Sequence, residues 1–474
     1  MVRATGARLA RPIGRHARRP GAASMTEDLL SIAGDIVAKA RQLGADEADA
    51  YLSSGVESTV TVRKGEVERL FEAGSRGVSI RVIKDKRTAV CNTSDLAPTA
   101  LDAMVRTAID LARISEPDEF AALPDREDLA TEMGAQLQMY DERIETLTVD
   151  EMKDIVLRAE QAAFDFDKRV TNSEGAEFGA DRGHVVLANS LGFAGSFPYT
   201  IASFSVSVLA DEPDGKKQSD YWFSVERAFH RLESAEDVGR RAAARVVRKI
   251  GGRKIATCEV PVVWDPVVTA GLLGVVAGAA SGEALFKRST FLADFEGQQA
   301  LSPLVTIVDD PTLAGRIGSR PFDGEGVRTR RNVIVQDGVF ERFLFDSYYA
   351  RRTGRRTTGN ASRSGDSIGV GGGNRIWQAG TSDPGEIVAS VSSGLYLTDL
   401  MGFGINQTTG DFSRGAAGVW IENGQLAYPV IEINVSGNLK QMLRDIDAVG
   451  SDLQWFAGGA APTIRMSHLT VSGL

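Results

Sequence analysis

The sequence predicts an α+β protein with mostly antiparallel sheets, flanking helices and a β-rich C-terminal domain. The length of 474 residues is enough for two or three domains with ample core. Fifty glycines exceed the usual share of about 7%, which indicates many tight turns. Short runs of alternating polarity recur at hairpin spacing, and capped amphipathic helices separate groups of them. This order is typical of α+β folds rather than doubly wound ones.

Residues 25–116 form the first predicted unit, an N-terminal α+β domain. A helix capped by Thr26 ends at Gly44, and alternating runs follow at 49–53, 58–64, 67–73, 78–84 and 87–91. An amphipathic helix over 98–114 closes the unit. Residues 117–146 are acidic and lack periodicity, and we interpret them as a linker.

Residues 1–24 contain six arginines and no acidic residue. They fit an organelle transit peptide or, as we favour, either a disordered tail or a misassigned start, with Met25 as the true beginning. The whole chain has 54 basic and 63 acidic residues, so without this segment the body is strongly acidic. An acidic body disfavours a nucleic-acid partner. No apolar run approaches the ~20 residues of a membrane helix.

Residues 147–252 form a central α+β domain, which opens with the capping box Thr148-x-x-Glu151. The C-terminal domain spans 253–474. Its first helix, 266–281, follows the N-cap Asp265 and is apolar on every side, which predicts complete burial. Segment 353–373 is rich in glycine and arginine and is expected to be a mobile basic loop. A final helix is expected over 439–449.

A metal site has little support in the sequence. The four histidines are His16, His184, His230 and His468, and no two lie at helical ligand spacing. A His-Glu-x-x-x-His motif does not occur. The two cysteines allow no disulfide framework and fit a reducing compartment.

Two further motifs lie in the glycine-rich segment. Ser367 occupies the centre of a Gly-x-Ser-x-Gly pattern, but its flanks do not predict the strand-to-helix turn that a nucleophile elbow requires. The glycines at 369–373 lack the spacing and lysine of a phosphate loop. With the arginines upstream they could hold an anion, or the segment could order against a partner or peptide.

The most informative stretch runs from Gly402 to about Leu439. It contains Thr-Gly-Asp-Phe-Ser-Arg-Gly-Ala at 409–416, Trp-Ile-Glu-Asn-Gly at 420–424, Tyr-Pro-Val at 428–430 and Gly-Asn-Leu at 437–439. These motifs resemble the C-terminal signature of the TldD/PmbA peptidase family, on its PmbA (TldE) side. The resemblance covers residues 25–474 and is strongest from 253 onward.

The resemblance implies a cytoplasmic subunit of a TldD–PmbA heterodimer, a protease that cleaves unfolded or linear peptides, including precursors in peptide maturation. Zinc would belong to the TldD-type partner, and this chain would hold no cofactor. Gly274, Val275 and Ala279 stand where that partner's histidine, glutamate and second histidine would be. Some relatives are labelled modulators of DNA gyrase, so a stand-alone binding or regulatory protein is an alternative. An independent serine hydrolase using Ser367 is another.

No catalytic or metal residue is assigned in this chain. Candidate contacts to substrate or partner lie mainly in the turn-rich stretch, and they are Asn406, Thr409, Gly410, Asp411, Arg414 and Asn360. The same residues could instead be buried turn formers. The expected partners are the TldD-type subunit, a second copy of the chain and unfolded peptides, with neither nucleic acid nor membrane.

Overall fold

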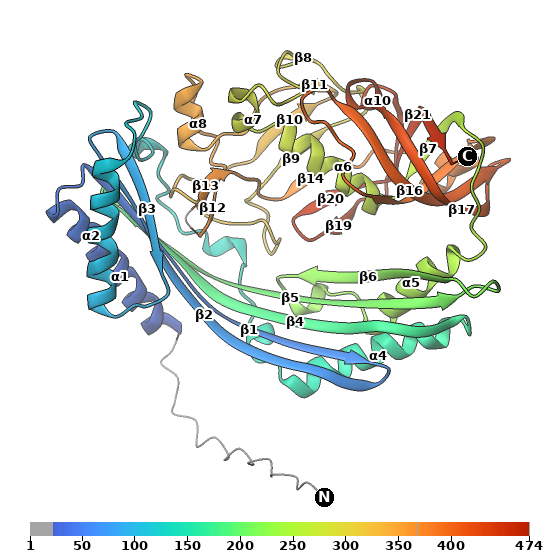
Figure 1. Cartoon of the computed structure of the whole chain (residues 1–474), viewed down its shortest axis with the longest axis horizontal. Coiled ribbons are helices and arrows are strands. Elements are labelled where there is room, and N and C mark those ends of the chain that lie inside the picture. The colour runs from blue at the N-terminus through green and yellow to red at the C-terminus, as the bar shows by residue number, and fades with distance from the viewer. Residues whose placement is uncertain (1–21, 366, 474) are drawn as a thin grey trace, which may run out of the picture.

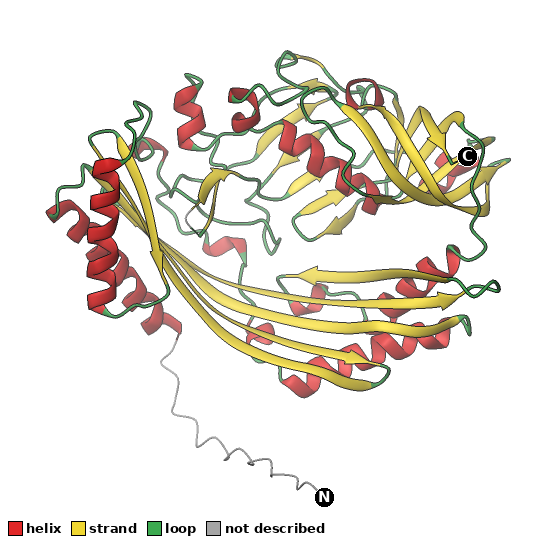
Figure 2. Ribbon diagram, viewed as in Figure 1, coloured by secondary structure: helices red, strands yellow, loops and turns green. Residues whose placement is uncertain are grey.

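The structure is a computed structural model that describes residues 22–365 and 367–473. It is a mixed α+β protein with several sheets, as predicted (Figure 2). Most of the basic segment 1–24 therefore lies outside the described residues. The first helix, α1 (Ala22–Gln42), already includes Thr26, so the predicted cap at that residue is wrong. Among the described residues, no helix combines the length and apolarity that crossing a bilayer requires.

One long antiparallel sheet underlies the first half of the chain, in the order β3-β2-β1-β4-β5-β6 (Figure 1). Its strands are β1 (Glu47–Arg63), β2 (Glu66–Lys84), β3 (Arg87–Thr93), β4 (Val170–Asn189), β5 (Ala194–Asp211) and β6 (Lys217–Glu226). Strands β1 and β4 pair from Asp49↔Asn189 to Val62↔Ala176. The sheet therefore runs without interruption through the segments that the sequence divides into two units.

Helices cover this sheet on its outer side. Helices α1 and α2 (Pro98–Ile114) lie at one end, and α4 (Val149–Phe166) and α5 (Ala235–Arg248) lie at the other (Figure 1). Alternate strand residues such as Phe178 and Phe204 are buried with α4 and α5. The opposite, concave side of the sheet is turned toward the C-terminal domain (Figure 1). Ser203 and Ser205, which alternate with the buried Phe204 on β5, are half-buried.

The C-terminal domain contains a six-stranded sheet in the order β17-β16-β15-β7-β21-β18. A further pairing of β17 with β21 closes five of these strands into a small barrel. The strands are β7 (Cys258–Trp264), β15 (Ser393–Met401), β16 (Asp411–Glu422), β17 (Gln425–Asn438), β18 (Ile446–Val449) and β21 (Ile464–Ser472).

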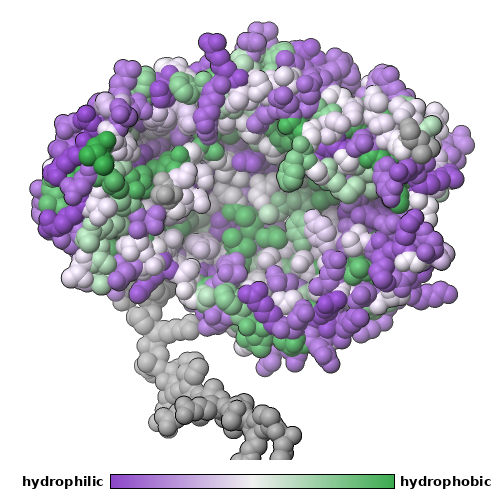
Figure 3. Space-filling view, in the orientation of Figure 1, coloured by the Kyte–Doolittle hydropathy of each residue, from purple (hydrophilic) through white to green (hydrophobic). Residues whose placement is uncertain are grey.

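A seven-stranded sheet packs beside the barrel in the order β19-β20-β14-β9-β10-β11-β8. It consists of β8 (Gln298–Gln299), β9 (Ile307–Asp309), β10 (Asn332–Gln336), β11 (Val339–Phe340), β14 (Arg375–Trp377), β19 (Gln454–Phe456) and β20 (Gly459–Ala461). Helix α6 (Pro266–Ala279) shares one apolar core with both sheets. Figure 3 shows the molecule hollowed between the large sheet and this domain.

Short elements complete the chain. They are α3 (Glu142–Glu145), α7 (Gly282–Phe286), α8 (Ser347–Arg352), α9 (Pro384–Ala389), α10 (Leu439–Met442), β12 (Ala361–Ser364) and β13 (Ser367–Val370). The helix expected over 439–449 is thus wrong, because only α10 is helical and the chain then pairs with β21 as β18. Residues 361–364 and 367–370 pair as the antiparallel strands β12 and β13 rather than forming a loop.

The arginines of segment 353–373 and its neighbours bind the rest of the molecule. Arg351 donates to the carbonyl oxygens of Phe120, Ala122 and Leu123 at 2.9, 2.6 and 3.1 Å. Arg356 pairs with the carboxylate of Asp128 at 2.9 Å. These contacts fix part of 117–146 against the C-terminal domain. The expected mobile basic loop is therefore a structured region with internally paired charges.

Candidate functional site

Helix α6 begins at the predicted cap. The Asp265 side chain accepts the Val267 amide proton, and Pro266 opens the helix. The helix is not wholly buried, however, because Gly271, Gly274 and Gly278 are exposed along one face. Glycine is neither strongly polar nor strongly apolar. A helix face made of glycines therefore does not interrupt the apolar pattern of the sequence, even though it is exposed. A Cβ added at Gly271 or Gly274 would meet nothing within 4 Å.

The turn segment 402–410 lies against this open face. The side chain of Gln407 lies beside Gly278, where an added Cβ would lie 2.9 Å from Nε2. Its main-chain oxygen accepts the Phe291 amide proton at 2.8 Å. The glycine-rich turns and α6 therefore form one surface of the C-terminal domain.

The predicted contact residues of this turn mostly hold the turn together. Asn406 Oδ1 accepts from the amides of Thr408 and Thr409 at 3.0 and 3.2 Å. Thr409 donates to Asp411 at 2.6 Å. Hydrogen bonds from Thr409 and Asn438 hold the pKa of Asp411 below its usual value. Asn406, Thr409 and Asp411 are nevertheless exposed, so their remaining polar atoms face solvent.

The other predicted contacts differ in accessibility. Gly410 is buried, and Arg414 is half-buried, with Nη2 donating to the Leu400 oxygen at 3.3 Å. Asn360 is fully buried and bonds Asp309 at 2.7 Å and Thr358 at 2.7 Å. Asn360 is thus separated from the turn segment and belongs to an internal hydrogen-bond network.

Sequence reasoning missed two exposed apolar side chains on this surface. Phe403 is completely exposed and Met401 is half exposed. Phe403 lies between two glycines, Gly402 and Gly404. This Gly-Phe-Gly pattern is the feature of the sequence that could have predicted its exposure. Exposed large apolar side chains of this kind are typical of contact surfaces.

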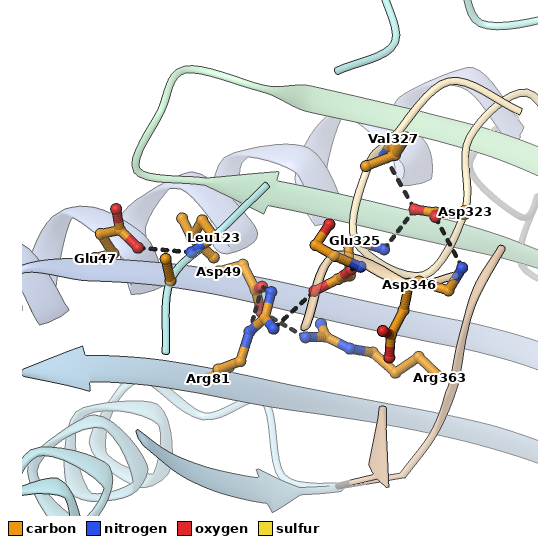
Figure 4. A network of polar contacts seen from close by, with 12 residues as sticks. Glu47, Asp49, Arg81, Leu123, Asp323, Glu325, Val327, Asp346 and Arg363 are labelled. Atoms are coloured by element: carbon orange, nitrogen blue, oxygen red, sulfur yellow. Dashed lines mark hydrogen bonds and ion pairs between the residues drawn. The ribbon is translucent and has the colours of Figure 1, made fainter. Parts of the chain in front are cut away.

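A buried ionic network joins the large sheet to the C-terminal domain (Figure 4). Arg81 on β2 donates to Asp49 on β1 and, at 2.9 Å, to Glu325. Arg363 on β12 reaches the other oxygen of Asp49 at 2.6 Å. All four side chains are at least nine-tenths buried. Sequence reasoning missed this network, because its members lie far apart along the chain.

Two more carboxyl groups adjoin the network. Burial and the neighbouring Glu325 raise the pKa of Asp323 to about 7, and the same causes raise the pKa of Asp346 to about 7. Asp323 accepts amide protons from Glu325, Val327 and Ala361. Burial would also raise the pKa of Asp49, but Arg363 and Arg81 outweigh it and lower that pKa.

The residues that the structure describes do not fit a zinc site. In the described part of the chain, no three His, Cys, Asp or Glu side chains are grouped as metal ligands. On α6, Gly274 offers no side chain and Ala279 is buried. His184 is buried on β4, and burial lowers its pKa.

Ser367 also lacks the surroundings of a nucleophile. It is exposed on β13, where its partner across the hairpin is Ser364. Ser367 begins strand β13 rather than a helix, so the strand-to-helix geometry of an elbow is not formed.

Comparison with known proteins extends these observations. Three family models match: PmbA/TldA metallopeptidase domain 1 over 48–112, the central domain over 142–250 and the C-terminal domain over 257–473. The chain is 35% identical to the metalloprotease PmbA of Escherichia coli O157:H7, over 95% of this chain and 98% of that protein. It is 34% identical to a PmbA homologue of Haemophilus influenzae, over 88% and 90% of the two chains.

Solved structures share the fold. A candidate modulator of DNA gyrase from Bacteroides thetaiotaomicron superposes with a TM-score of 0.88 at 27% identity, covering 95% of this chain and all of that one. TldE from Thermococcus kodakarensis superposes with a TM-score of 0.84 at 22% identity, over 93% of this chain and all of that one.

Proposed function

Because this chain belongs to the PmbA/TldD metallopeptidase family, we propose that it is the metal-free subunit of a two-subunit zinc peptidase that cleaves unfolded or linear peptides. A TldD-type subunit would supply the zinc and the hydrolytic chemistry. This chain would supply walls of the chamber that holds the peptide. A cytoplasmic location fits this role and belongs to the proposal.

The observation that carries the proposal is the open face of α6. An apolar helix with three exposed glycines presents backbone and small side chains, and no side chain that ligates zinc or transfers protons. Such a face allows close approach of an extended chain, and main-chain contacts tolerate many sequences. The exposed Asn406 and Thr409 lie in the turn segment whose Gln407 contacts that face, and the exposed Asp411 follows it.

The hollow between the large sheet and the C-terminal domain supports the same role (Figure 3). Strand β5, which carries the half-buried Ser203 and Ser205, belongs to the sheet on one side of the hollow, and α6 belongs to the domain on the other side. A folded protein domain is excluded by size from a hollow within a single subunit, whereas an extended peptide is not. Selection of unfolded substrates would then follow from shape.

The direct experiment reconstitutes the pair. The purified chain alone should contain no stoichiometric zinc and should not cleave a dye-quenched linear peptide. Mixing with a TldD-type subunit should give a stable complex and zinc-dependent cleavage. Elemental analysis that finds about one zinc per isolated chain, lost together with an activity of that chain, would refute the proposal. Cleavage by the partner alone at the full rate of the mixture would refute it equally.

A regulatory protein acting on DNA gyrase is the second candidate, on the ground that a structural relative carries that description. The acidic balance of the chain disfavours direct DNA contact. We therefore rank it below the peptidase subunit.

A further inference from the structure

Part of strand β2 is an edge of the large sheet that no other strand covers (Figure 1). Strand β3 pairs with β2 only from Val78 to Lys84. Residues 66–77 of β2, which we call the free edge, therefore pair with β1 on one side and, in the described part of the chain, with no strand on the other. All of them are exposed except Ala73 and Gly77, which are half-buried. The free edge thus presents a row of main-chain donors and acceptors to solvent.

The opposite edge of the same sheet is covered. There the ring centroid of Phe456 on β19 lies 6.1 Å from that of Trp222 and 6.5 Å from that of Phe223 on β6. By contrast, a Cβ added at Gly74 on the free edge would meet nothing within 4 Å. Proteins cover or interrupt such edges, because an open edge pairs readily with another chain. The contrast indicates that the free edge is an interaction surface.

Large apolar side chains occupy both faces of the free edge. The exposed fractions are 39% for Val67, 57% for Leu70 and 39% for Phe71. Leu70 lies opposite Val60, which is buried in the core with α4, so Leu70 is on the helix-covered face of the sheet. Phe71 is the next residue and lies on the concave face. Exposed apolar side chains gathered in this way are typical of contact surfaces.

The charges of the free edge are separated along the strand. Glu66 and Glu68 lie near the turn to β1, and Arg76 lies near the other end. None of the three forms an ion pair within the part of the chain that the structure describes. A second copy that lies antiparallel would bring the acidic end of each strand beside Arg76 of the other. This contact would occur twice, because the pair is two-fold symmetric.

The extent of the free edge also suits an antiparallel copy. Its midpoint lies next to Phe71, so two edges paired about that residue would overlap over nearly their whole length. The overlap would end before Val78, where β3 begins to pair with β2. The two Phe71 side chains would lie opposite each other on the concave face, and opposed aromatic side chains stabilise antiparallel strands. Arg69, whose guanidinium lies 5.1 Å from the centre of the Phe71 ring, would flank the pair.

We propose that the free edge of β2 pairs antiparallel, about Phe71, with the same edge of a second copy of this chain. The two six-stranded sheets would then continue into each other across a two-fold axis. This inference goes beyond the proposed function, because it concerns the outer edge of the sheet and not the hollow. Main-chain hydrogen bonds, the pair of Phe71 rings and the two charged contacts would hold the copies together.

The oligomeric state of the purified full chain tests this, and sedimentation equilibrium measures the Kd of the dimer. We expect a dimer of the parent chain and a Kd at least about tenfold higher for Phe71→Lys, because the substitution places two cations opposite each other. Tyr221→Lys is the matched control, since Tyr221 is an exposed aromatic side chain on another strand of the same sheet. It should leave the Kd unchanged. A monomeric parent chain, or equal Kd values for Phe71→Lys and the parent, would overturn the inference.

Disulfide cross-linking checks the register. Pairing about Phe71 places position 69 of one copy opposite position 73 of the other. A mixture of Arg69→Cys and Ala73→Cys chains should therefore cross-link on mild oxidation. Each variant alone should not, because identical positions would lie about 13 Å apart along the strands. The parent chain is the control for the half-buried Cys91 and Cys258. Cross-linking of either variant alone, or no cross-link in the mixture, would overturn the arrangement.

A charge exchange tests the contact between the ends. Arg76→Glu should weaken the dimer roughly several-fold, since it would lie beside Glu66 and Glu68 of the other copy. Glu66→Arg and Glu68→Arg added to the same chain should restore the parental Kd, because the opposite charges are then exchanged on both strands. An unchanged Kd for Arg76→Glu, or no recovery in the triple variant, would overturn the antiparallel pairing.

The outcomes separate this inference from the proposed function. Dimerisation with this pattern, combined with no cleavage by the mixture with a TldD-type subunit, would keep the edge pairing and refute the peptidase subunit. Zinc-dependent cleavage by that mixture, combined with a monomeric isolated chain, would keep the subunit and refute the edge pairing. If Phe71→Lys weakens only the binding of the TldD-type subunit, the free edge binds that partner and not a second copy.

Discussion

Arg363 of the β12 hairpin reaches across the domain boundary to Asp49 on β1, and its Nη2 lies 2.6 Å from Oδ1 (Figure 4). Their side chains are 2% and 0% exposed, so the charge of Arg363 depends on Asp49 for compensation, and the charge of Asp49 depends on Arg363 and Arg81. Buried pairs are costly to break because the remaining charge stays desolvated. The two domains are thus joined by a contact whose loss affects the whole molecule.

Replacing Arg363 with methionine should therefore destabilise the chain by on the order of 3–5 kcal/mol, because Asp49 would retain a single cationic partner. Urea unfolding of both forms measures the difference. Arg240→Met is the matched control, since Arg240 forms an exposed pair with Asp237, and exposed pairs contribute little. A loss for Arg363→Met no larger than that of the control would contradict the assignment.

Stability should depend on pH through Asp323 and Asp346. Each has a pKa of about 7 in the folded chain, against about 3.9 in an unfolded one. The folded state therefore holds these protons more tightly. Their contribution to stability is complete below about pH 4 and is lost as pH rises through 7.

Asp346→Asn isolates this effect, because the amide mimics the protonated carboxyl group and keeps an oxygen for the Tyr349 amide. The variant should match the parent near pH 4 and exceed its unfolding free energy at pH 8 by on the order of 2–4 kcal/mol. Chemical unfolding across that range is the measurement, and Asp154→Asn, in an exposed pair, is the control. If the unfolding free energies of parent and variant change by the same amount between pH 5 and 8, the pKa of Asp346 is not raised.

The sequence predicted the fold class, the main helices and the signature turns, because these depend on local periodicity, caps and glycine. It divided long strands into short runs. Residues Ser53 to Glu57 of β1 do not alternate in polarity, yet they pair with β2 and β4 on both sides. Whether such residues form a strand depends on their pairing with distant segments, and a local sequence pattern does not contain that information.

The same limitation applies to the site. Arg363 and its neighbouring arginines look like a solvated basic loop in sequence, because their acidic and carbonyl partners lie far away along the chain. The contact between β6 and β19 could not be predicted either, since residues 222–226 and 454–457 approach each other only in the folded molecule. The α6 glycines were visible, but only the packing shows which face they leave open.

Ser367→Ala should leave cleavage by the reconstituted complex unchanged. Ser367 is exposed on a two-stranded hairpin, and the geometry of a nucleophile elbow is absent there. Initial rates with a dye-quenched peptide decide the matter. Loss of turnover in a variant that folds and assembles normally would revive the serine hydrolase alternative.

Arg414→Glu should lower cleavage by the complex at least about tenfold, a change of about 1.4 kcal/mol in the barrier, while it lowers the stability of the isolated chain much less. Arg414 is half-buried beside the turn segment and makes a single hydrogen bond, to the Leu400 oxygen at 3.3 Å. A reversed charge at this position would therefore disturb contacts with the peptide or the partner subunit more than the packing of the core.

Arg444→Glu is the matched control, because Arg444 also donates to one carbonyl oxygen at 3.3 Å, that of Gln299. Cleavage by the mixture and urea unfolding of the isolated chain are compared for both variants. An Arg414→Glu chain that unfolds early, but whose folded fraction cleaves normally, would show that Arg414 only stabilises the turn.

The open face of α6 gives the last prediction. Gly274→Ala should stabilise the isolated chain by about 0.5–1 kcal/mol, because alanine restricts the unfolded chain and the new Cβ meets nothing within 4 Å. Gly239→Ala in α5 is the matched control, also within a helix. Its Cβ would lie 2.0 Å from the Ala159 oxygen, so it should destabilise. A bulky Gly274→Leu should keep the fold but reduce cleavage by the complex, since its side chain would occupy the peptide's path. If Gly274→Leu cleaves at the parental rate, α6 does not form a wall of the chamber.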